Sequence, residues 1–302
     1  MKSRYMSALL AMGLCAPCWG ARCTTVLDPA ILREYQDYVA RVRQAAASRN
    51  PVELWWVPQS ESAEAAARLA SGKVVRSNIS DAALNRRIAR QNGTVIHWIG
   101  AVRIRGTTLA ALKSVLEDYS RYDRIYRPLI FDCKAERAAE GPPAAYHVTF
   151  GLHSAYRFAS IFLQHYTFRV DARIEHSGIN PPDAPELRVY LAANEIRESD
   201  SGVPGRHDLL ARYHDHGIMW DMTAFWRALP SGPDVYLEFE TITLARSVES
   251  FACNLGIIPV PRSVVAAAMD SLPAQSVETI LQGTKAECER AVARPAREAS
   301  VP

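Results

Sequence analysis

Apolar and polar residues alternate along most of the chain between Thr94 and Arg246, whereas apolar residues recur every three to four positions near both ends. Alternation is typical of strands, and the longer spacing is typical of helices. Runs rich in β-branched and aromatic residues mark the strands, and turns containing Gly and Pro separate several of them. We predict strands over residues 94–104, 129–135, 145–152, 156–173, 187–197, 209–226 and 234–246.

Capping signals and apolar stripes place the helices. Asp28 followed by Pro29 is a typical helix start, a short Ala-rich helix is expected over 61–70, and another follows Thr108. The last helix is expected over 262–292, with a kink at Pro273. The apolar stripes of the two long helices are Ile31, Tyr35, Tyr38, Val39 and Val42 in the first, and Val264, Val265, Ala268, Leu272, Val277, Ile280 and Leu281 in the last.

Several predicted strands follow one another without a helix between them, which favours an antiparallel sheet. One face of such a sheet needs a cover, and the last helix supplies it. We therefore predict an α+β fold in which an antiparallel sheet wraps around a long C-terminal helix, after a helical N-terminal extension. A curved sheet of this kind leaves a cavity wherever the lining side chains do not fill it.

The strand over 235–244 shows which face would line that cavity. By the period of two, Phe239, Thr241 and Thr243 point towards the helix, together with Val235 and Leu237. Glu238 and Glu240 fall on the other face, which we expect to be solvated. The same strand therefore gives no pair of carboxylates in a cleft, as glycoside hydrolysis would need.

The first residues have the pattern of a secretory signal peptide. Lys2 and Arg4 precede a short apolar run that ends near Cys15, and small residues follow at Gly20 and Ala21. The run is too short to span a membrane, and we find no later segment that is long and apolar enough. We predict a cleaved signal peptide over 1–21 and a periplasmic or secreted protein.

Export to such a compartment permits disulfides. The processed chain would retain four cysteines, for which three pairings exist, and the sequence does not choose between them. Free buried thiols are the alternative. The four are Cys23, Cys133, Cys253 and Cys288.

Charge excludes one class of partner. The formal net charge is +3, and removal of Lys2 and Arg4 lowers it to +1. A chain so close to neutral has no electrostatic footprint for nucleic acid.

A family resemblance is carried by five segments, 96–102, 118–128, 219–227, 235–246 and 258–263. Taken in order, these segments resemble bacterial START-like proteins of the SRPBCC superfamily, and the resemblance spans roughly residues 73–285. It implies a helix-grip fold with an internal cavity, in a superfamily whose members bind lipids, sterols, polyketides and other apolar compounds, and it implies no fixed catalytic residues.

This chain departs from the family pattern at three places. Trp220 is followed by Asp221 where relatives carry Arg, Arg246 is followed by Ser247-Val248 where they carry Ile-Pro, and Pro273 interrupts the last helix. We divide the chain into a signal peptide (1–21), a helical N-terminal extension (22–72), a START-like helix-grip domain (73–290) and a disordered tail (291–302). Trp55 and Trp56 in the extension are interpreted as docked anchors.

Candidate chemistry is sparse. His214 and His216 would share one face of a strand, which is a spacing that zinc sites use, but no third ligand is evident, so a solvated or core-edge position is the default. Nucleophile elbows and phosphate-binding loops are absent from the sequence. We predict no catalytic residues, no metal and no cofactor.

The predicted cavity should combine aromatic walls with a few polar groups that orient a ligand. We expect a carrier or binding protein for a lipid or other hydrophobic small molecule. A cyclase- or hydratase-like enzyme and a protein-interaction module with a filled core are the alternatives, and membrane contact and oligomeric state are left open. The candidate cavity residues are His97, Trp98, Arg157, Tyr166, Phe168, Tyr190, Trp220, Trp226, Phe239, Thr241, Ala268 and Leu272.

Overall fold

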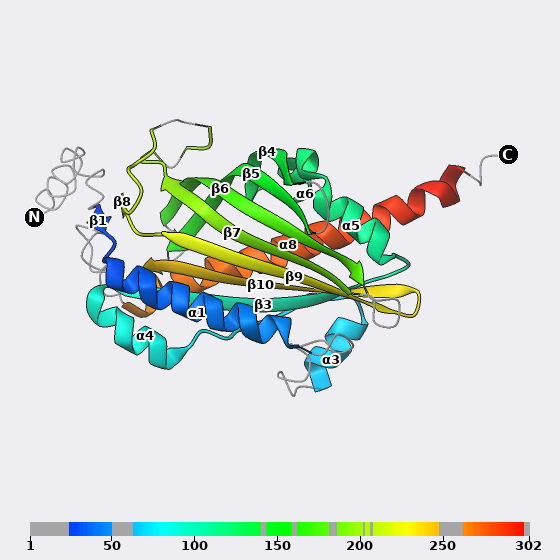
Figure 1. Ribbon diagram of the computed structural model, residues 1–302, viewed down its shortest axis with the longest axis horizontal. Helices are drawn as coiled ribbons and strands as arrows, with labels where there is room; N and C mark the ends of the chain where they lie inside the picture. Colours follow the sequence, from blue (N-terminus) through cyan, green and yellow to red (C-terminus); the bar gives the residue numbers. More distant parts are fainter. Residues whose placement is uncertain are drawn as a thin grey trace, which may run out of the picture.

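An antiparallel sheet of eight strands forms the centre of the molecule in the computed structural model (Figure 1). The structure describes residues 24–49, 63–139, 143–158, 162–180, 186–201, 203–205, 208–247 and 262–298. The strand order is β2-β3-β10-β9-β7-β6-β5-β4, and a separate pair, β1-β8, lies outside this sheet. The strands are β1 (Thr25–Val26), β2 (Val75–Asn78), β3 (Gly93–Ile104), β4 (Ile130–Ala139), β5 (Ala144–Phe158), β6 (Phe162–Asn180), β7 (Glu186–Glu198), β8 (His214–Asp215), β9 (Asp221–Ser231) and β10 (Asp234–Arg246).

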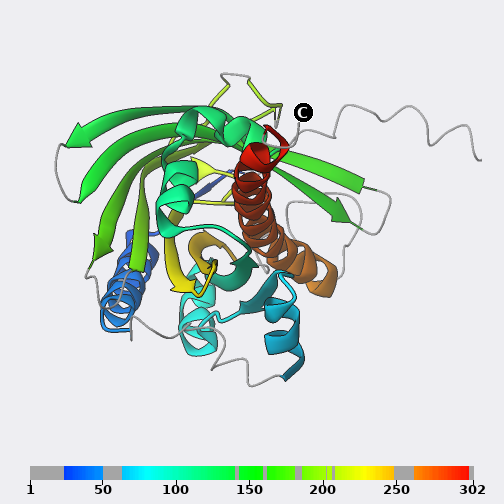
Figure 2. The same cartoon turned by 90° about the vertical axis from the view of Figure 1, so that its right-hand side faces the viewer.

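The sheet curves around the long C-terminal helix α8 (Arg262–Glu298), which Figure 2 shows nearly end-on. Helix α5 (Leu109–Glu117) and the short η2 (Tyr119–Arg121) and α6 (Tyr122–Ile125) lie on the same side of the sheet. The strand order and this central helix make the fold a helix grip, so the predicted α+β fold class is confirmed.

The concave face of the sheet and α8 enclose the larger hydrophobic core. Val277, Ile280 and Leu281 of the predicted apolar stripe are buried there. Gly100 of β3 allows α8 to approach closely, because a Cβ at this position would lie 2.6 Å from Val277 Cγ1 and 2.9 Å from the Val75 carbonyl oxygen. The core therefore depends on the absence of a side chain at one strand position.

A second layer of helices covers the convex face. Helix α1 (Pro29–Ala47) begins as predicted, with the Ala30 N–H donating to Asp28 Oδ1 at 2.8 Å. Figure 1 shows α1 lying along the sheet, where it shares a separate core with α4 (Ala82–Ile88). The strand residues of this second core are Val95, Ile242 and Leu244, together with Trp220 just before β9. Helix α3 (Ala63–Ala70) packs with β2 and β3 in a third, smaller core.

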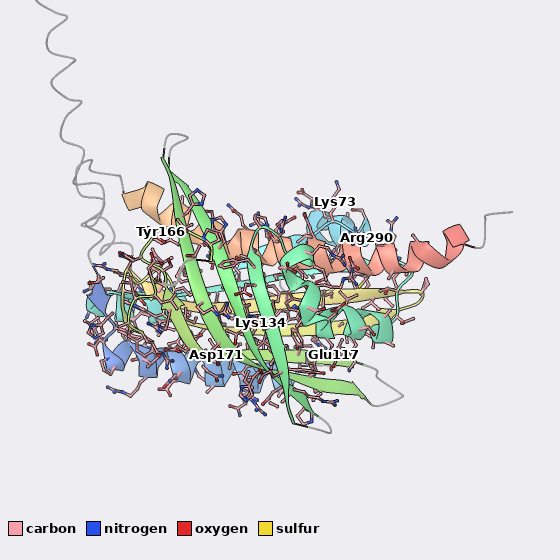
Figure 3. All side chains as sticks on the ribbon, turned by 90° about the horizontal axis from the view of Figure 1, so that it is seen from above. Lys73, Glu117, Lys134, Tyr166, Asp171 and Arg290 are labelled. Atoms are coloured by element: carbon pink, nitrogen blue, oxygen red, sulfur yellow. The ribbon has the colours of Figure 1, made fainter. Side chains whose placement is uncertain are left out.

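Two of the predicted strands each cover parts of two separate strands in the structure. The stretch 156–173 spans the end of β5 and the first half of β6. All of β5 pairs with β6 up to His176, and the two strands cross α8 (Figure 3). The stretch 209–226 contains β8 and the start of β9, and Gly217 with a φ of 75° lies between them. A residue with a positive φ is not in the extended conformation, so the strand ends there. The alternation of apolar and polar residues does not reveal such a break.

Other features differ from the sequence predictions or were absent from them. Strand β2, helix α4 and the 3₁₀ helix η1 (Ala89–Gln91) were not predicted, and α8 continues to Glu298, past Pro295, where a tail was expected. Cys133 and Cys288 are free thiols, whereas Cys23 and Cys253, like Trp55 and Trp56, lie outside the described residues. Within the described chain, the helices include none with the length and apolar character of a membrane span.

Candidate functional site

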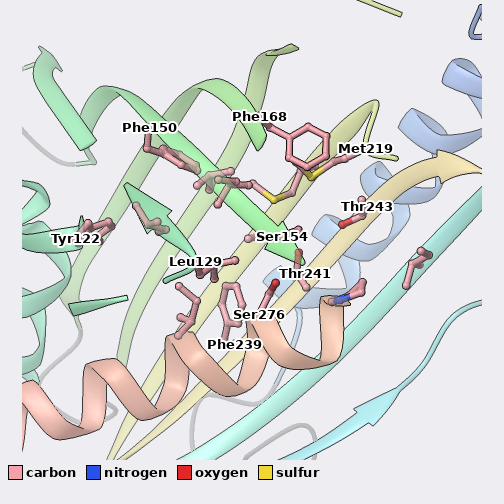
Figure 4. A pocket seen from close by; sticks show the side chains of 18 of the residues that line it. Tyr122, Leu129, Phe150, Ser154, Phe168, Met219, Phe239, Thr241, Thr243 and Ser276 are labelled. Carbon is pink, nitrogen blue, oxygen red and sulfur yellow. The ribbon is translucent and has the colours of Figure 1, made fainter. Parts of the chain in front are cut away.

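A cavity of about 110 Å³ lies between the concave face of the sheet and α8. Residues two apart on one strand point to the same face, so each strand contributes alternate side chains. Figure 4 shows side chains from the sheet and from α8 around this space. The largest contributions come from Phe150, Leu152 and Ser154 of β5, Met222, Ala224 and Trp226 of β9, Phe239, Thr241 and Thr243 of β10, and Pro273, Ser276 and Ile280 of α8.

The lining is almost entirely apolar. Its polar side-chain groups within the described chain are four aliphatic hydroxyls, the phenol of Tyr122 and the indole N–H of Trp226, which is buried without a hydrogen-bond partner. The Tyr122 hydroxyl donates to the Leu116 carbonyl at 2.5 Å, and burial raises the pKa of this phenol well above its ordinary value. The four hydroxyl residues are Ser154, Thr241, Thr243 and Ser276.

The size of the cavity limits what it holds. Pockets for drug-sized ligands usually measure roughly 300–1,000 Å³, so the present space suits about one small ring system. Met219 and Met222 line the cavity, and unbranched methionine side chains rotate readily to fit an irregular ligand.

Four of the twelve candidate residues line the cavity, namely Phe168, Trp226, Phe239 and Thr241. Trp98 and Tyr166 belong to the core around the cavity and are not part of its lining. The Trp98 indole N–H instead donates to Asp270 Oδ1 of α8 at 3.1 Å.

Three candidates are placed on the wrong face. His97 is bonded to Tyr38 of α1, Tyr190 lies beneath the Arg43 guanidinium at 4.0 Å, and Trp220 belongs to the convex-face core. Ile96, the neighbour of His97 in sequence, does line the cavity. The predicted face of this strand is therefore wrong by one residue, since successive residues point to opposite faces. The side chains of Arg157, Ala268 and Leu272 lie outside the described residues.

Other lining residues were missed. Ser154 lies two positions after Leu152 on β5, so the period of two could have found it. Ile218 and Met219 lie on the irregular segment between β8 and β9, and no sequence signal assigns such a segment to a face.

The prediction that Glu238 and Glu240 are solvated is wrong, because both are at most 3% exposed beneath the N-terminal extension. Arg49 Nη1 donates to Glu240 Oε2 at 2.8 Å, and His97 Nε2 lies 2.8 Å from the other carboxylate oxygen. The Tyr38 hydroxyl lies 2.7 Å from His97 Nδ1, which completes a chain of polar contacts from α1 to β10. Burial alone would raise the pKa of Glu240, but the hydrogen bonds from His97 and Arg49 outweigh burial and lower it.

A second set of charged side chains lies next to this series of polar contacts. Arg227 of β9 is bonded to Glu186 and lies 3.5 Å from Glu238. Arg188 reaches the end of α1, where its Nη1 donates to the Ala46 carbonyl at 3.1 Å. Cations at a helix C-terminus satisfy exposed carbonyls, so these contacts attach the extension to the sheet.

His214 and His216 do not form the shared face that their spacing suggested. His214 is exposed, whereas His216 is buried and its Nδ1 lies 2.9 Å from Glu198 Oε1. Asp215 between them is also buried and accepts hydrogen bonds from the Gly217 N–H and the Trp220 indole. In the described part of the chain, these and other His, Cys, Asp and Glu side chains form no group of three suited to a metal ion.

Comparison with known proteins gives structural likenesses only. No family model and no curated protein matches the chain. Among solved structures, the Zhui aromatase/cyclase from Streptomyces sp. R1128 is 16% identical, with 66% of this chain and 96% of that chain covered and a TM-score of 0.39. A STAR-related lipid transfer protein from Xanthomonas axonopodis is 12% identical, with 65% and 97% covered and a TM-score of 0.37.

Human STARD10 is also similar, at 7% identity, with 68% of this chain and 80% of that chain covered and a TM-score of 0.31. At TM-scores below 0.5 the likenesses establish no function for this chain, and its helix-grip fold follows from its own strand order.

Proposed function

We propose that this protein binds a hydrophobic small molecule in the cavity between the sheet and α8. The observation that carries the proposal is the lining, in which apolar side chains from seven strands and α8 surround a space with a few hydroxyl groups. Binding sites for small molecules commonly have this composition. Each 100 Å² of apolar ligand surface that leaves water would contribute roughly 2.5 kcal/mol before the costs of ordering.

We further propose that the protein is exported and acts as a carrier. The signal-peptide pattern over residues 1–21 supports export, and a cavity of this kind would shield an apolar compound from water. Fractionation of cells that express the full chain tests the localisation. Recovery of an unprocessed chain from the cytoplasm would contradict export.

An enzyme acting on an apolar substrate would need an acid or base at the cavity. Within the described lining the ionisable group is Tyr122, whose hydroxyl is engaged with the Leu116 carbonyl. No specific observation therefore favours the enzymatic alternative.

The experiment is to purify the protein from its native compartment, extract it with organic solvent and identify the released compounds by mass spectrometry. An apolar compound at close to one equivalent per chain is expected. The Ala224→Leu variant places a larger side chain in the cavity and should reduce the bound compound at least tenfold. Ala192→Leu is the matched control, because Ala192 is half-buried on the neighbouring strand and is not part of the lining.

Two results would overturn the proposal. One is an empty extract from protein that also fails to bind an environment-sensitive apolar dye. The other is a compound that Ala224→Leu retains as well as Ala192→Leu does, since that compound would be bound elsewhere.

A further inference from the structure

Four aliphatic hydroxyls lie in one part of the cavity, and the other polar groups of its described lining are the Tyr122 phenol and the Trp226 indole N–H. Figure 4 shows Ser154, Thr241, Thr243 and Ser276 towards one end, with Tyr122 and Phe150 towards the other. Thr241 and Thr243 are at most 8% exposed. The Thr241 hydroxyl has a partner at 3.5 Å, the Thr223 carbonyl, which is the long limit of a hydrogen bond. It can therefore turn towards a ligand with little loss.

Charged side chains close to the cavity are directed away from it or already paired. Glu238 and Glu240 lie on the opposite face of β10, where Arg227 and Arg49 bond them. Asp270 of α8 accepts hydrogen bonds from the Trp98 indole and the Asn78 amide. In the part of the chain that the structure describes, the lining contains no Lys, Arg, His, Asp or Glu.

Burial of an ion in such a place is strongly unfavourable. A carboxylate or ammonium that leaves water needs an opposite charge or several strong hydrogen bonds, and a ligand without them binds in its neutral form instead. A hydroxyl group both donates and accepts, so it suits a ketone, ester or alcohol oxygen equally well.

We infer that the ligand is an apolar molecule bearing an uncharged oxygen group, such as a ketone, ester or alcohol, which the hydroxyls of Thr241, Thr243, Ser154 and Ser276 orient. This inference rests on the proposed function, because it concerns the same cavity. Fatty acid anions, phosphate-bearing lipids and amines are excluded as ligands held wholly within it.

The test compares four probes that share one bicyclic hydrocarbon: naphthalene, 2-acetylnaphthalene, 2-naphthoate and 2-naphthylmethylammonium. Binding is measured by calorimetry at pH 7.5 on the full processed chain. The ketone should bind at least as tightly as naphthalene, and the two ions at least 30-fold more weakly than the ketone. Because only the neutral acid would enter, naphthoate affinity should rise about tenfold for each unit that the pH falls towards its own pKa.

A variant identifies the hydroxyl that acts. Thr241→Val removes the hydroxyl with little change of shape and should weaken the ketone severalfold while leaving naphthalene unchanged. Thr149→Val is the matched control, since Thr149 lies on β5 and is not part of the lining. Near-ultraviolet circular dichroism at each pH shows that the proteins stay folded.

The outcomes separate the two proposals. Suppose that naphthalene binds, and that naphthoate binds as tightly as the ketone with an affinity that does not change with pH. This result would overturn the inference and leave the proposed function intact. An equal effect of Thr241→Val on naphthalene and on the ketone would also overturn it. Failure of all four probes would overturn both.

Discussion

At the scale of single residues, Asp215 is the clearest buried acid in the structure. It is 1% exposed, and one oxygen accepts from the Gly217 N–H at 2.7 Å and the Trp220 indole at 2.9 Å. Burial, and then the nearby charge of Glu198, raise its pKa to about 7. Its pKa in the unfolded chain is about 3.9. Asp215 therefore contributes most to the free energy of unfolding below about pH 4, where its carboxyl is protonated in both states. This contribution is lost as the pH rises to 7.

Asp215→Asn keeps an oxygen that can accept both hydrogen bonds but cannot ionise. We expect the variant to be more stable than the natural protein at pH 8, by roughly 4 kcal/mol, and the gain to shrink towards zero as the pH falls to 4. Urea unfolding at several pH values measures this.

Asp208→Asn is the control for that measurement. Asp208 is an exposed acid in the same region, and hydrogen bonds from Ser199 and Ser201 lower its pKa, so its loss should destabilise the protein at pH 8. A gain for Asp215→Asn that is the same at pH 4 and pH 8 would contradict the prediction.

At the scale of elements, α1 is joined to the sheet by apolar packing and by a buried ion pair. Ile31 and Tyr35 are at most 2% exposed, and the Tyr35 hydroxyl donates to the Ile242 carbonyl at 3.2 Å. Arg49 follows the helix and bonds both oxygens of Glu240. The extension is therefore a structural layer that covers apolar residues of the convex face, among them Ile242 and Leu244.

Glu240→Gln keeps the shape of the side chain but leaves the Arg49 charge without its buried carboxylate. We expect a loss of about 2 kcal/mol in the free energy of unfolding at pH 7. The comparison is Glu34→Gln, which breaks the exposed ion pair of α1 with Arg87 and should leave the unfolding midpoint unchanged. Equal losses in the two variants would show that the buried pair has no special role.

At the scale of the whole molecule, the two faces of one sheet are covered by helices from opposite ends of the chain. Residues of α1 and α4 share their core with β3 and β10, and the same strands pack on α8 through their other face. The helical extension and the grip therefore have no independent cores, and they should unfold together.

Hydrogen exchange tests this cooperativity. Amides in the middle of α1 should exchange with nearly the same free energy of opening as those of β3 and β10. Amides of α3, which has one buried residue, should exchange faster through local opening. Fast exchange in α1 with slow exchange in β10 would mean that the extension detaches while the grip stays folded.

Sequence patterns located much of this architecture. The caps at Asp28 and Thr108, the stripe of α1, the strands β3 and β10 and the cavity-facing side of β10 all came from local signals. These features depend on neighbours within a few positions along the chain, which is the range over which capping and periodicity act. The break between β8 and β9 was missed because Gly217, with its positive φ, interrupts an otherwise extended pattern.

Tertiary structure alone decided that the face of β10 opposite the cavity is buried as well. Glu240 was expected to face solvent, and His97 was expected to line the cavity. Instead the two side chains contact each other beneath α1, where Arg49 also bonds Glu240. Polar residues at alternate strand positions normally indicate a face exposed to solvent. Such a face can be buried only when side chains from distant parts of the sequence bond its polar groups. The cavity is likewise assembled from strands, a loop and α8 that are far apart in sequence, so its volume and its set of hydroxyls follow from packing and not from any local pattern.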